Sequence, residues 1–242
     1  MSVFQEDIYS KDWRELKLAV FDVETTGLRP ESERITEIGI VLFKDGKPRG
    51  VYNKLINPAK RIDAKASKII GITNDMVDHL PLFHERIDKI QKILSKVDVW
   101  CCFNDSFDRS FVTTEFRRCK TVLKERPCLD PLIFSQFMWP STSNKLDDVA
   151  RRLRVEPSDE LIQDLKIVGK RHRACFDALL TGMCLFRMSG ILPKTLRQTL
   201  YVQDFLYRYW LGVTKGGEKR YVRSLEPTMP PEHVTAQAEE VP

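Results

Sequence analysis

Apolar and polar positions form alternating blocks that predict strands followed by helices. Residues 16–21 are an apolar run, residues 35–43 are a second run rich in valine and isoleucine, and residues 51–56 alternate apolar with polar side chains. The charged, glycine-containing segment 44–47 between the last two is typical of a hairpin turn. The three segments therefore predict an antiparallel meander at the start of a sheet.

Helical periodicity follows this meander. Residues 64–70 end at Gly71 like a short helix with a C-terminal glycine, and residues 82–97 repeat apolar side chains at a helical spacing. Residues 99–103 predict a short buried strand. Further helices are expected at residues 106–119, 130–137, 145–153, 175–188 and 194–211. Strands that alternate with helices are typical of the α/β class.

Composition sets the expected domain organisation. Apolar residues make up 42% of the 242 residues, which is enough for one good-sized core. We expect a main domain over residues 1–190, a C-terminal helix over 191–212 and a flexible tail over 213–242, where prolines follow a glycine pair. No apolar run reaches the roughly 18 residues that a membrane span needs, so we expect no membrane partner.

The cysteines and the N-terminus favour an intracellular, cytoplasmic protein. The six cysteines contain no Cys-x-x-Cys pair and no regular spacing, so we expect reduced, buried thiols. The first residues lack the basic and apolar segments of a secretory signal. The formal net charge of +5 suits a partner with negative charge.

Two acidic residues follow the first apolar run. Asp22 and Glu24 flank Val23, and because side chains alternate along a strand, both carboxylates project to one face about 7 Å apart. Such a pair is either two solvated acids at a strand end or part of a cation site. Thr25-Thr26-Gly27 follows directly and offers hydroxyl groups and a backbone that a ligand can approach closely. This segment favours the cation site.

Further acids and a histidine occur later in the chain. Asp108 falls in the first turn of an expected helix, where an acid also suits helix capping and the helix dipole. His172 and Asp177 would point about 140° apart on a regular helix. They converge only if His172 precedes the helix and Asp177 lies within it. Taken alone, His172 between basic residues is also an ordinary surface histidine.

Together these segments resemble the DEDD exonucleases of the histidine-containing subclass, and among them the epsilon-type proofreading subunits of bacterial DNA polymerase III. Residues 21–28, Phe-Asp-Val-Glu-Thr-Thr-Gly-Leu, resemble the first motif, residues 104–108, Asn-Asp-Ser-Phe-Asp, the second, and His172 with Asp177 the third. The likeness runs from about residue 18 to 185. It implies a ribonuclease-H-like α/β fold with a mixed central β-sheet flanked by helices, and residues 1–190 as the exonuclease domain.

The resemblance also implies two-metal hydrolysis of phosphodiesters. Two Mg²⁺ or Mn²⁺ ions, about 4 Å apart, would be held by Asp22, Glu24, Asp108 and Asp177, with Asp22 bridging both ions and Asp108 acting mainly through water. His172 would accept a proton from the attacking water. Without metal, carboxylates 4 Å apart repel by about 4 kcal/mol per pair at an effective dielectric near 20, so such a cluster makes poor sense as packing. We see no thiol or histidine cluster for a softer ion.

Substrate contacts are expected beside these motifs. Leu28 and Phe107 would stack against terminal bases, although Phe107 equally suits the core. Basic residues around His172 would attract a polyanion. The expected contact residues are Thr25, Thr26, Gly27, Leu28, Asn104, Phe107, Lys170, Arg171 and Arg173.

The implied function is 3′-to-5′ hydrolysis of single-stranded DNA ends to nucleoside monophosphates, in proofreading or repair. An RNA-trimming exoribonuclease of the same subclass is an alternative, since few contacts discriminate the 2′-hydroxyl. A catalytically silent nucleic-acid-binding module is an alternative of another class. It would lack a ligand or the base, whereas all five residues are present.

The last expected helix offers a possible interaction face. Tyr201, Phe205 and Tyr209 recur every four residues, so this face must be buried. Either the helix packs on the main domain, or residues 195–212 dock on a DNA polymerase or sliding clamp, with the tail from Val213 as a tether. Residues 203–207, Gln-Asp-Phe-Leu-Tyr, resemble a clamp-binding peptide, but such a peptide cannot be extended inside a regular helix.

Overall fold

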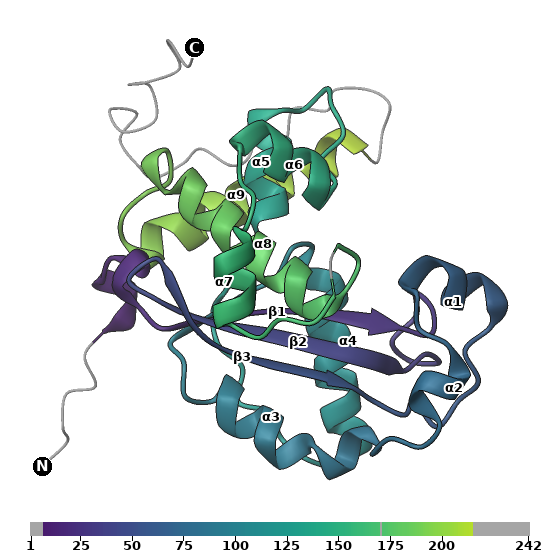
Figure 1. Cartoon of the computed structure of the whole chain (residues 1–242). Coiled ribbons are helices and arrows are strands. Elements are labelled where there is room, and N and C mark those ends of the chain that lie inside the picture. Colours follow the sequence, from purple (N-terminus) through teal and green to yellow (C-terminus); the bar gives the residue numbers. More distant parts are fainter. Residues whose placement is uncertain (1–6, 170, 215–242) are drawn as a thin grey trace, which may run out of the picture.

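The computed structural model describes residues 7–169 and 171–214 (Figure 1). In this part of the chain, five strands form one sheet in the order β3-β2-β1-β4-β5. β1, β2 and β3 are antiparallel neighbours, whereas β4 and β5 continue the sheet parallel to β1, so the sheet is mixed. Their bounds are β1 Leu18–Thr25, β2 Ile35–Lys44, β3 Lys47–Leu55, β4 Val99–Cys101 and β5 Cys128–Leu129. The predicted α/β class with a mixed sheet is confirmed.

Helices cover both faces of this sheet and the end at which β1 finishes. Figure 1 shows α8 against one face, α3 and α4 against the other, and α1 with α2 beyond the end of β1. The helices are α1 Ala64–Ile70, α2 Asn74–Val77, α3 Ile87–Leu94, α4 Asp105–Arg118, α5 Pro131–Met138, α6 Leu146–Leu153, α7 Asp159–Asp164, α8 Ala174–Arg187 and α9 Leu196–Thr214, with short 3₁₀ turns at Ile8–Ser10, Trp13–Glu15, Phe83–Glu85 and Met188–Gly190.

Several boundaries differ from the sequence expectation. β1 does not end before Asp22 but continues through Thr25, because its backbone keeps pairing with β2. Backbone hydrogen bonds between strands do not depend on whether the side chains are polar. The helix expected at residues 82–97 is a 3₁₀ turn followed by the shorter α3. β5, α2 and α7 were not predicted, since each is too short to show a period of its own.

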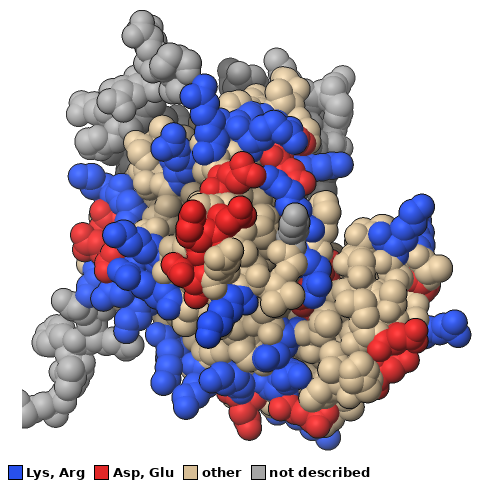
Figure 2. Space-filling model, viewed as in Figure 1, with Lys and Arg blue, Asp and Glu red and all other residues tan. Residues whose placement is uncertain are grey.

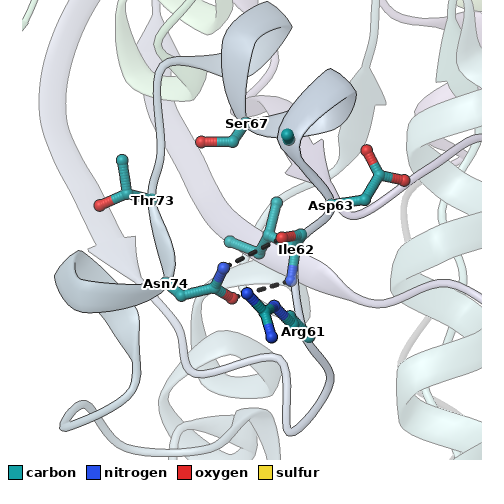
Figure 3. A pocket seen from close by; sticks show the side chains of 7 residues that line it. Arg61, Ile62, Asp63, Ser67, Thr73 and Asn74 are labelled. Atoms are coloured by element: carbon teal, nitrogen blue, oxygen red, sulfur yellow. Dashed lines mark hydrogen bonds between the residues drawn. The ribbon is translucent and has the colours of Figure 1, made fainter.

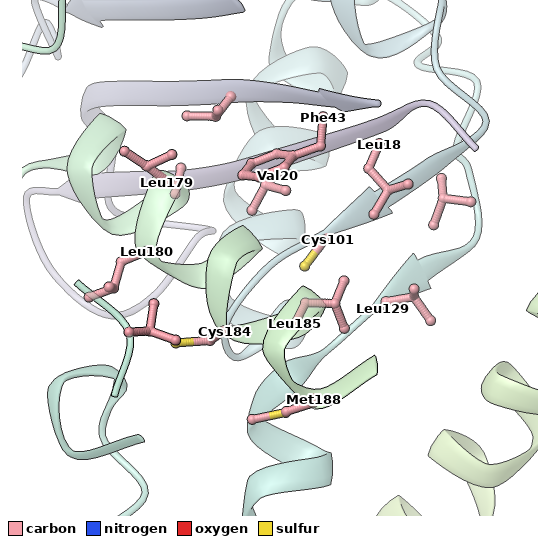
Figure 4. Close-up of a cluster of buried hydrophobic side chains, with 14 of the residues drawn as sticks. Leu18, Val20, Phe43, Cys101, Leu129, Leu179, Leu180, Cys184, Leu185 and Met188 are labelled. Atoms are coloured by element: carbon pink, nitrogen blue, oxygen red, sulfur yellow. The ribbon is translucent and has the colours of Figure 1, made fainter. Parts of the chain in front are cut away.

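Alternation along β1 divides its side chains between two hydrophobic clusters. Leu18 and Val20 pack with Phe43 and Leu179 on the face that α8 covers, as Figure 4 shows. Phe21 and its neighbours of the same parity pack on the face that α3 and α4 cover. The next positions of the α8 face along β1 are Asp22 and Glu24. The sheet therefore directs both acids towards the beginning of α8.

A glycine in β2 lets α8 begin very close to the sheet. A Cβ atom on Gly39 would lie 2.2 Å from the backbone nitrogen of Cys175 in the first turn of α8. Real Cβ atoms do not approach backbone so closely, so only glycine fits at this position. The close contact fixes the start of α8 directly over β2, beside the acidic end of β1.

The last helix, α9, packs on the rest of the domain. Leu196 and Leu206 are buried in the same cluster as β1 and α8. Gln203 accepts a hydrogen bond from the Asp130 backbone nitrogen (2.8 Å) and donates one to the Cys128 carbonyl (3.0 Å). Residues 203–207 thus lie inside a regular helix with the glutamine engaged, which argues against an extended clamp-binding peptide. Tyr201 and Phe205 remain 41% and 37% exposed.

Two further expectations concern membranes and thiols. Among the described helices, none combines the length and apolar character needed to cross a bilayer. All six cysteines are free, and every one except Cys119 is buried. The tail expected at 213–242 falls outside the described residues from 215 onwards, and so do residues 1–6.

Replacing Leu206 by alanine should destabilise the isolated protein by about 2–4 kcal/mol, because it leaves a cavity in the main core. Tyr207 is 44% exposed, so Tyr207→Ala is the matched control and should change the free energy of unfolding by less than about 1 kcal/mol. Urea denaturation without any partner measures both. Equal, small effects would show that α9 does not belong to the core.

Candidate active site

Three carboxylates from distant parts of the sequence meet where β1 ends. Asp22 and Glu24 come from β1, and Asp177 comes from the first turn of α8. Each offers a carboxylate oxygen that lies within 4.8 Å of those of the other two. Strand alternation and the position of α8 thus create a compact acidic cluster.

Asp108 lies at the free edge of β1. β4 pairs with β1 only as far as Cys101 opposite Val20, so the backbone beyond Val20 has no strand on that side. Asp108, in the first turn of α4, fills this position: its Oδ1 accepts a hydrogen bond from the Val23 backbone nitrogen (2.9 Å). The side chain is buried and does not belong to the group of three closest carboxylates.

His172 meets the geometric condition that the sequence set for it. It precedes α8, whereas Asp177 lies within this helix. The backbone of His172 has a left-handed φ of 64°, which is unusual for a residue other than glycine. Its backbone nitrogen donates a hydrogen bond to Asp177 Oδ2 (3.2 Å), and its side chain is exposed at the edge of the acidic cluster.

Burial and mutual repulsion make these carboxyl groups hard to ionise together. Burial raises the pKa of Asp22 well above its usual range, and the charges of Asp108, Glu24 and Asp177 raise it further. The pKa of Glu24 rises to about 8 through burial and the neighbouring carboxylates. Burial raises that of Asp177 to about 6, and it also raises that of Asp108. A bound cation would reduce the repulsion among these carboxylates and favour their ionised form.

The loop after β1 is held by its own hydroxyl groups. Thr25 Oγ1 donates a hydrogen bond to the Gly27 carbonyl (2.7 Å), and Thr26 Oγ1 donates one to Glu33 Oε2 (2.5 Å). A Cβ atom on Gly27 would meet the Glu33 side chain at 2.9 Å, so a larger residue would displace the glutamate that binds Thr26. Leu28 is 81% exposed at the tip of this loop. Of these four expected contact residues, Leu28 is thus the most accessible.

The expected contacts on α4 differ in accessibility. Asn104 adopts a left-handed φ of 71° just before α4, and its side chain is exposed. Phe107 is partly buried and packs against Phe111, with the ring centroids 4.9 Å apart. It therefore contributes to the core as well as to the edge of the site.

The two described arginines beside His172 are both ion-paired. Arg171 pairs with Asp147 of α6, and both side chains are about one-third exposed. Arg173 pairs through two nitrogens with Glu37 of β2, at 2.8 Å each. Lys170 lies outside the described residues. Sequence reasoning missed Glu37; a glutamate inside a strand rich in valine and isoleucine is the signal that could have found it.

A second group of possible ligands differs from the acidic cluster in its chemistry. Cys102, Asp105 and Cys128 bring ligand atoms within 4.8 Å of one another, a proximity that the sequence did not show. However, Asp105 already pairs with Arg109 (2.9 Å), and burial raises the pKa of both thiols. The expectation that the chain has no thiol cluster is therefore wrong, because these two thiols do lie close together. Both thiols nevertheless favour their protonated form.

A surface hollow near α1 does not include the acidic cluster. Figure 3 shows this hollow, of about 430 Å³, and the Asn74 amide that bridges the backbone nitrogen and carbonyl of Ile62. None of the predicted site residues lines it. Lys and Arg side chains spread over the face in Figure 2, around smaller groups of Asp and Glu. Such a surface suits a polyanionic partner.

The acidic cluster fits divalent cations with hard ligands. Its donors are carboxylate oxygens, which suit Mg²⁺ or Mn²⁺ better than zinc. Asp22 lies close to Glu24 and Asp177, and the charge of Asp108 also acts on it and raises its pKa. This arrangement is compatible with two ions that share Asp22.

Comparisons with known proteins agree with this geometry. A family model described as Exonuclease matches residues 19–183. A PolC-type DNA polymerase III of Thermotoga petrophila is 28% identical over 186 residues, which are 77% of this chain and 13% of that protein. The corresponding protein of Bacillus subtilis is 28% identical over 173 residues, 70% of this chain and 11% of that protein. The chain therefore spans only about an eighth of these relatives.

Solved structures show the same fold. Exonuclease X in complex with 5′ overhanging duplex DNA has a TM-score of 0.60 at 21% identity, covering 77% of this chain and 99% of that one. The nuclease domain of 3′hExo, a DEDDh family member bound to rAMP, has a TM-score of 0.59 at 15% identity, covering 74% and 94%. The predicted ribonuclease-H-like fold is confirmed.

The metal-free protein should lose stability as the pH rises from 6 to 8. The pKa values of Glu24 and Asp177, about 8 and about 6 in the folded state, lie above those of free carboxyl groups. The folded state thus binds more protons than the unfolded chain in this range, so raising the pH favours unfolding. Melting temperatures should fall accordingly, and Mn²⁺ should restore them at pH 8.

The variant Asp22→Asn should reduce both the pH effect and the response to Mn²⁺. Asp159→Asn, on the exposed surface of α7, is the control and should behave like wild type. A wild-type melting temperature with the same pH dependence as Asp22→Asn would contradict the electrostatic account.

Proposed function

Because this chain belongs to the exonuclease family, we propose that it hydrolyses single-stranded nucleic acid in the 3′-to-5′ direction and releases nucleoside monophosphates. Membership in the DEDD-type exonucleases was predicted from the sequence and is confirmed. The observation that carries the proposal is the meeting of Asp22, Glu24 and Asp177, with Asp108 at the adjacent edge of β1. We propose two Mg²⁺ or Mn²⁺ ions as cofactors.

The residues of the site divide the work between binding and proton transfer. When bound, the two cations would stabilise the attacking and leaving oxygens of an in-line displacement. Asp22, Glu24 and Asp177 would hold them directly, and Asp108 would act mainly through water, because its Oδ1 is engaged by the Val23 backbone. His172 accepts the proton of the attacking water, a role that suits an exposed imidazole at the edge of the cluster.

Substrate is held by the edges of the site. Leu28 projects from a loop that is fixed by internal hydrogen bonds, so it can contact a terminal base with little loss of freedom. Arg171 supplies a positive charge that a phosphate can approach, because its pairing with Asp147 is exposed. Asn104 and Phe107 lie on the α4 side, with Phe107 anchored in the core.

DNA is the substrate that the relatives favour. Those compared are PolC-type DNA polymerases III, which supports a role in proofreading or repair and a cytoplasmic location. RNA remains the alternative, since one structural neighbour is described with histone mRNA and another with rAMP. A silent binding module has less support, because all four carboxylates and His172 are present at the site.

A polymerase is the protein partner that the relatives suggest. The chain corresponds to a small part of these polymerases, so we propose that it works together with a polymerase when it proofreads. Tyr201, Phe205 and Tyr207 are exposed along α9 and could take part. A sliding clamp has less support, since Gln203 is engaged inside the helix.

Digestion of 3′-labelled and 5′-labelled single-stranded DNA and RNA, side by side with Mg²⁺ or Mn²⁺, tests the proposal. Wild type should shorten DNA stepwise from the 3′ end and release mononucleotides. Asp22→Ala should lower the rate at least about 10³-fold while the protein stays folded, because it removes the shared ligand and relieves repulsion. Asp159→Ala is the control.

Each other outcome has a definite meaning. Degradation of RNA alone would replace the DNA proposal by the exoribonuclease alternative. Activity in excess chelator, or full activity of Asp22→Ala, would contradict the metal site itself.

A further inference from the structure

We propose that Glu37 and Arg173 act as positioning residues that hold His172 at the acidic cluster, and that Arg173 is not a substrate contact. The pair is called the Glu37–Arg173 latch below. This inference rests on the proposed function, since it assigns a role in the same reaction. It also revises the expectation that both arginines beside His172 bind substrate.

The latch joins β2 to the start of α8 through three hydrogen bonds. Arg173 Nε donates to Glu37 Oε2 and Arg173 Nη2 donates to Glu37 Oε1, each at 2.8 Å. The Ala174 backbone nitrogen donates a further bond to Glu37 Oε2 (3.3 Å). Helix α8 has no cap from its own N-cap side chain, so a carboxylate from a neighbouring strand serves its first turn instead.

The segment that the latch holds has an unfavourable backbone. His172 directly precedes Arg173 and has a φ of 64°, a conformation that persists only when surrounding contacts impose it. The bond between Arg173 and Glu37 attaches the residue after His172 to β2. The bond from the His172 backbone nitrogen to Asp177 attaches His172 itself to α8. Loss of the latch would let His172 relax away from the carboxylates.

The two arginines beside His172 differ in burial, which separates their roles. Arg171 and Asp147 are 37% and 34% exposed, so water and salt weaken their attraction and a phosphate can replace Asp147. Arg173 and Glu37 are 22% and 0% exposed. Separating them would leave a buried carboxylate without a counter-charge, which is strongly unfavourable. Arg173 is therefore fixed, whereas Arg171 is available to substrate.

The latch also limits the negative charge beside the acidic cluster. Glu37 lies directly opposite Glu24 in the register of β1 and β2. Arg173 neutralises Glu37 at this point, so that the strand adds no net negative charge beside the proposed metal ligands. Removing Arg173 would add repulsion at Glu24 in addition to releasing His172.

The protein contains a matched control pair. Arg34 and Glu115 form a similar two-nitrogen ion pair, at 2.7 and 3.0 Å, with side-chain exposures of 26% and 1%. This pair joins the start of β2 to α4 and does not contact the His172 segment. Arg34→Gln thus removes a similar two-nitrogen contact elsewhere in the fold, while Glu115 keeps a second partner in Arg118 (2.9 Å).

Steady-state kinetics of Arg173→Gln, Glu37→Gln and the double variant test the latch. We expect kcat to fall about 10- to 100-fold with KM for single-stranded DNA changed less than about threefold, and the double variant to be no slower than the slower single variant. The acidic limb of the pH–rate profile should flatten, because His172 would no longer be held in place as the proposed base. Arg173→Lys should not restore kcat, because lysine cannot form the two-nitrogen contact.

The controls should respond differently. Arg34→Gln should lower the melting temperature, because it removes a partly buried ion pair, yet keep kcat within about threefold of wild type. Arg171→Gln should raise KM more than it lowers kcat. A raised KM with normal kcat in Arg173→Gln would show that Arg173 is a substrate contact. An equal loss of kcat in Arg34→Gln would show that the effect is general destabilisation. Either result overturns the latch.

Hydrogen–deuterium exchange gives a readout that does not depend on activity. Backbone exchange over residues 171–177 should accelerate in Arg173→Gln and Glu37→Gln but not in Arg34→Gln. Unchanged exchange would overturn the latch even if the enzyme is active. Inactivity of wild type on DNA and RNA would instead contradict the proposed function, and the exchange measurement would still decide whether the latch holds this segment.

Discussion

The repulsion among the carboxylates where β1 ends is the constraint on which the rest of this structure depends. Asp22, Glu24 and Asp177 lie within 4.8 Å of one another through their oxygens, and Asp108 adds a further charge. Such a cluster opposes folding, so it persists only because well-packed elements hold it together. The same burial and repulsion would be relieved by small, hard cations, which is the physical basis of the proposed metal site.

The fold brings these acids together by simple means. Because side chains alternate along β1, Asp22 and Glu24 both face α8. Because β4 is short, the Val23 backbone nitrogen has no strand partner and donates its hydrogen bond to Asp108 instead. Gly39 removes the side chain that would keep α8 from the sheet. The two hydrophobic clusters on either side of the sheet supply the stability that the acids reduce. Along β1, the acidic site residues therefore lie directly next to buried residues of the hydrophobic core.

Local patterns in the sequence predicted much of this arrangement, whereas contacts between distant residues escaped it. The helix at Ala64–Ile70 and the turn at residues 44–47 follow from signals within a few residues, and the motif acids follow from their resemblance to a known family. Glu37 escaped because its partner Arg173 is 136 residues away. Arg171 and Arg173 look alike in sequence, and only burial distinguishes them.

The measurement that tests the central claim most directly is the number of Mn²⁺ ions bound per chain. The protein is first stripped of metal with a chelator, and Mn²⁺ is then added at pH 8 while electron paramagnetic resonance measures the concentration of free ion. If the repelling carboxylates form a shared two-ion site, wild type should bind two Mn²⁺ per chain, and Asp22→Asn should lose tight binding of both, because Asp22 is the ligand proposed to be shared. Full occupancy in Asp22→Asn, or no binding to wild type, would contradict the account.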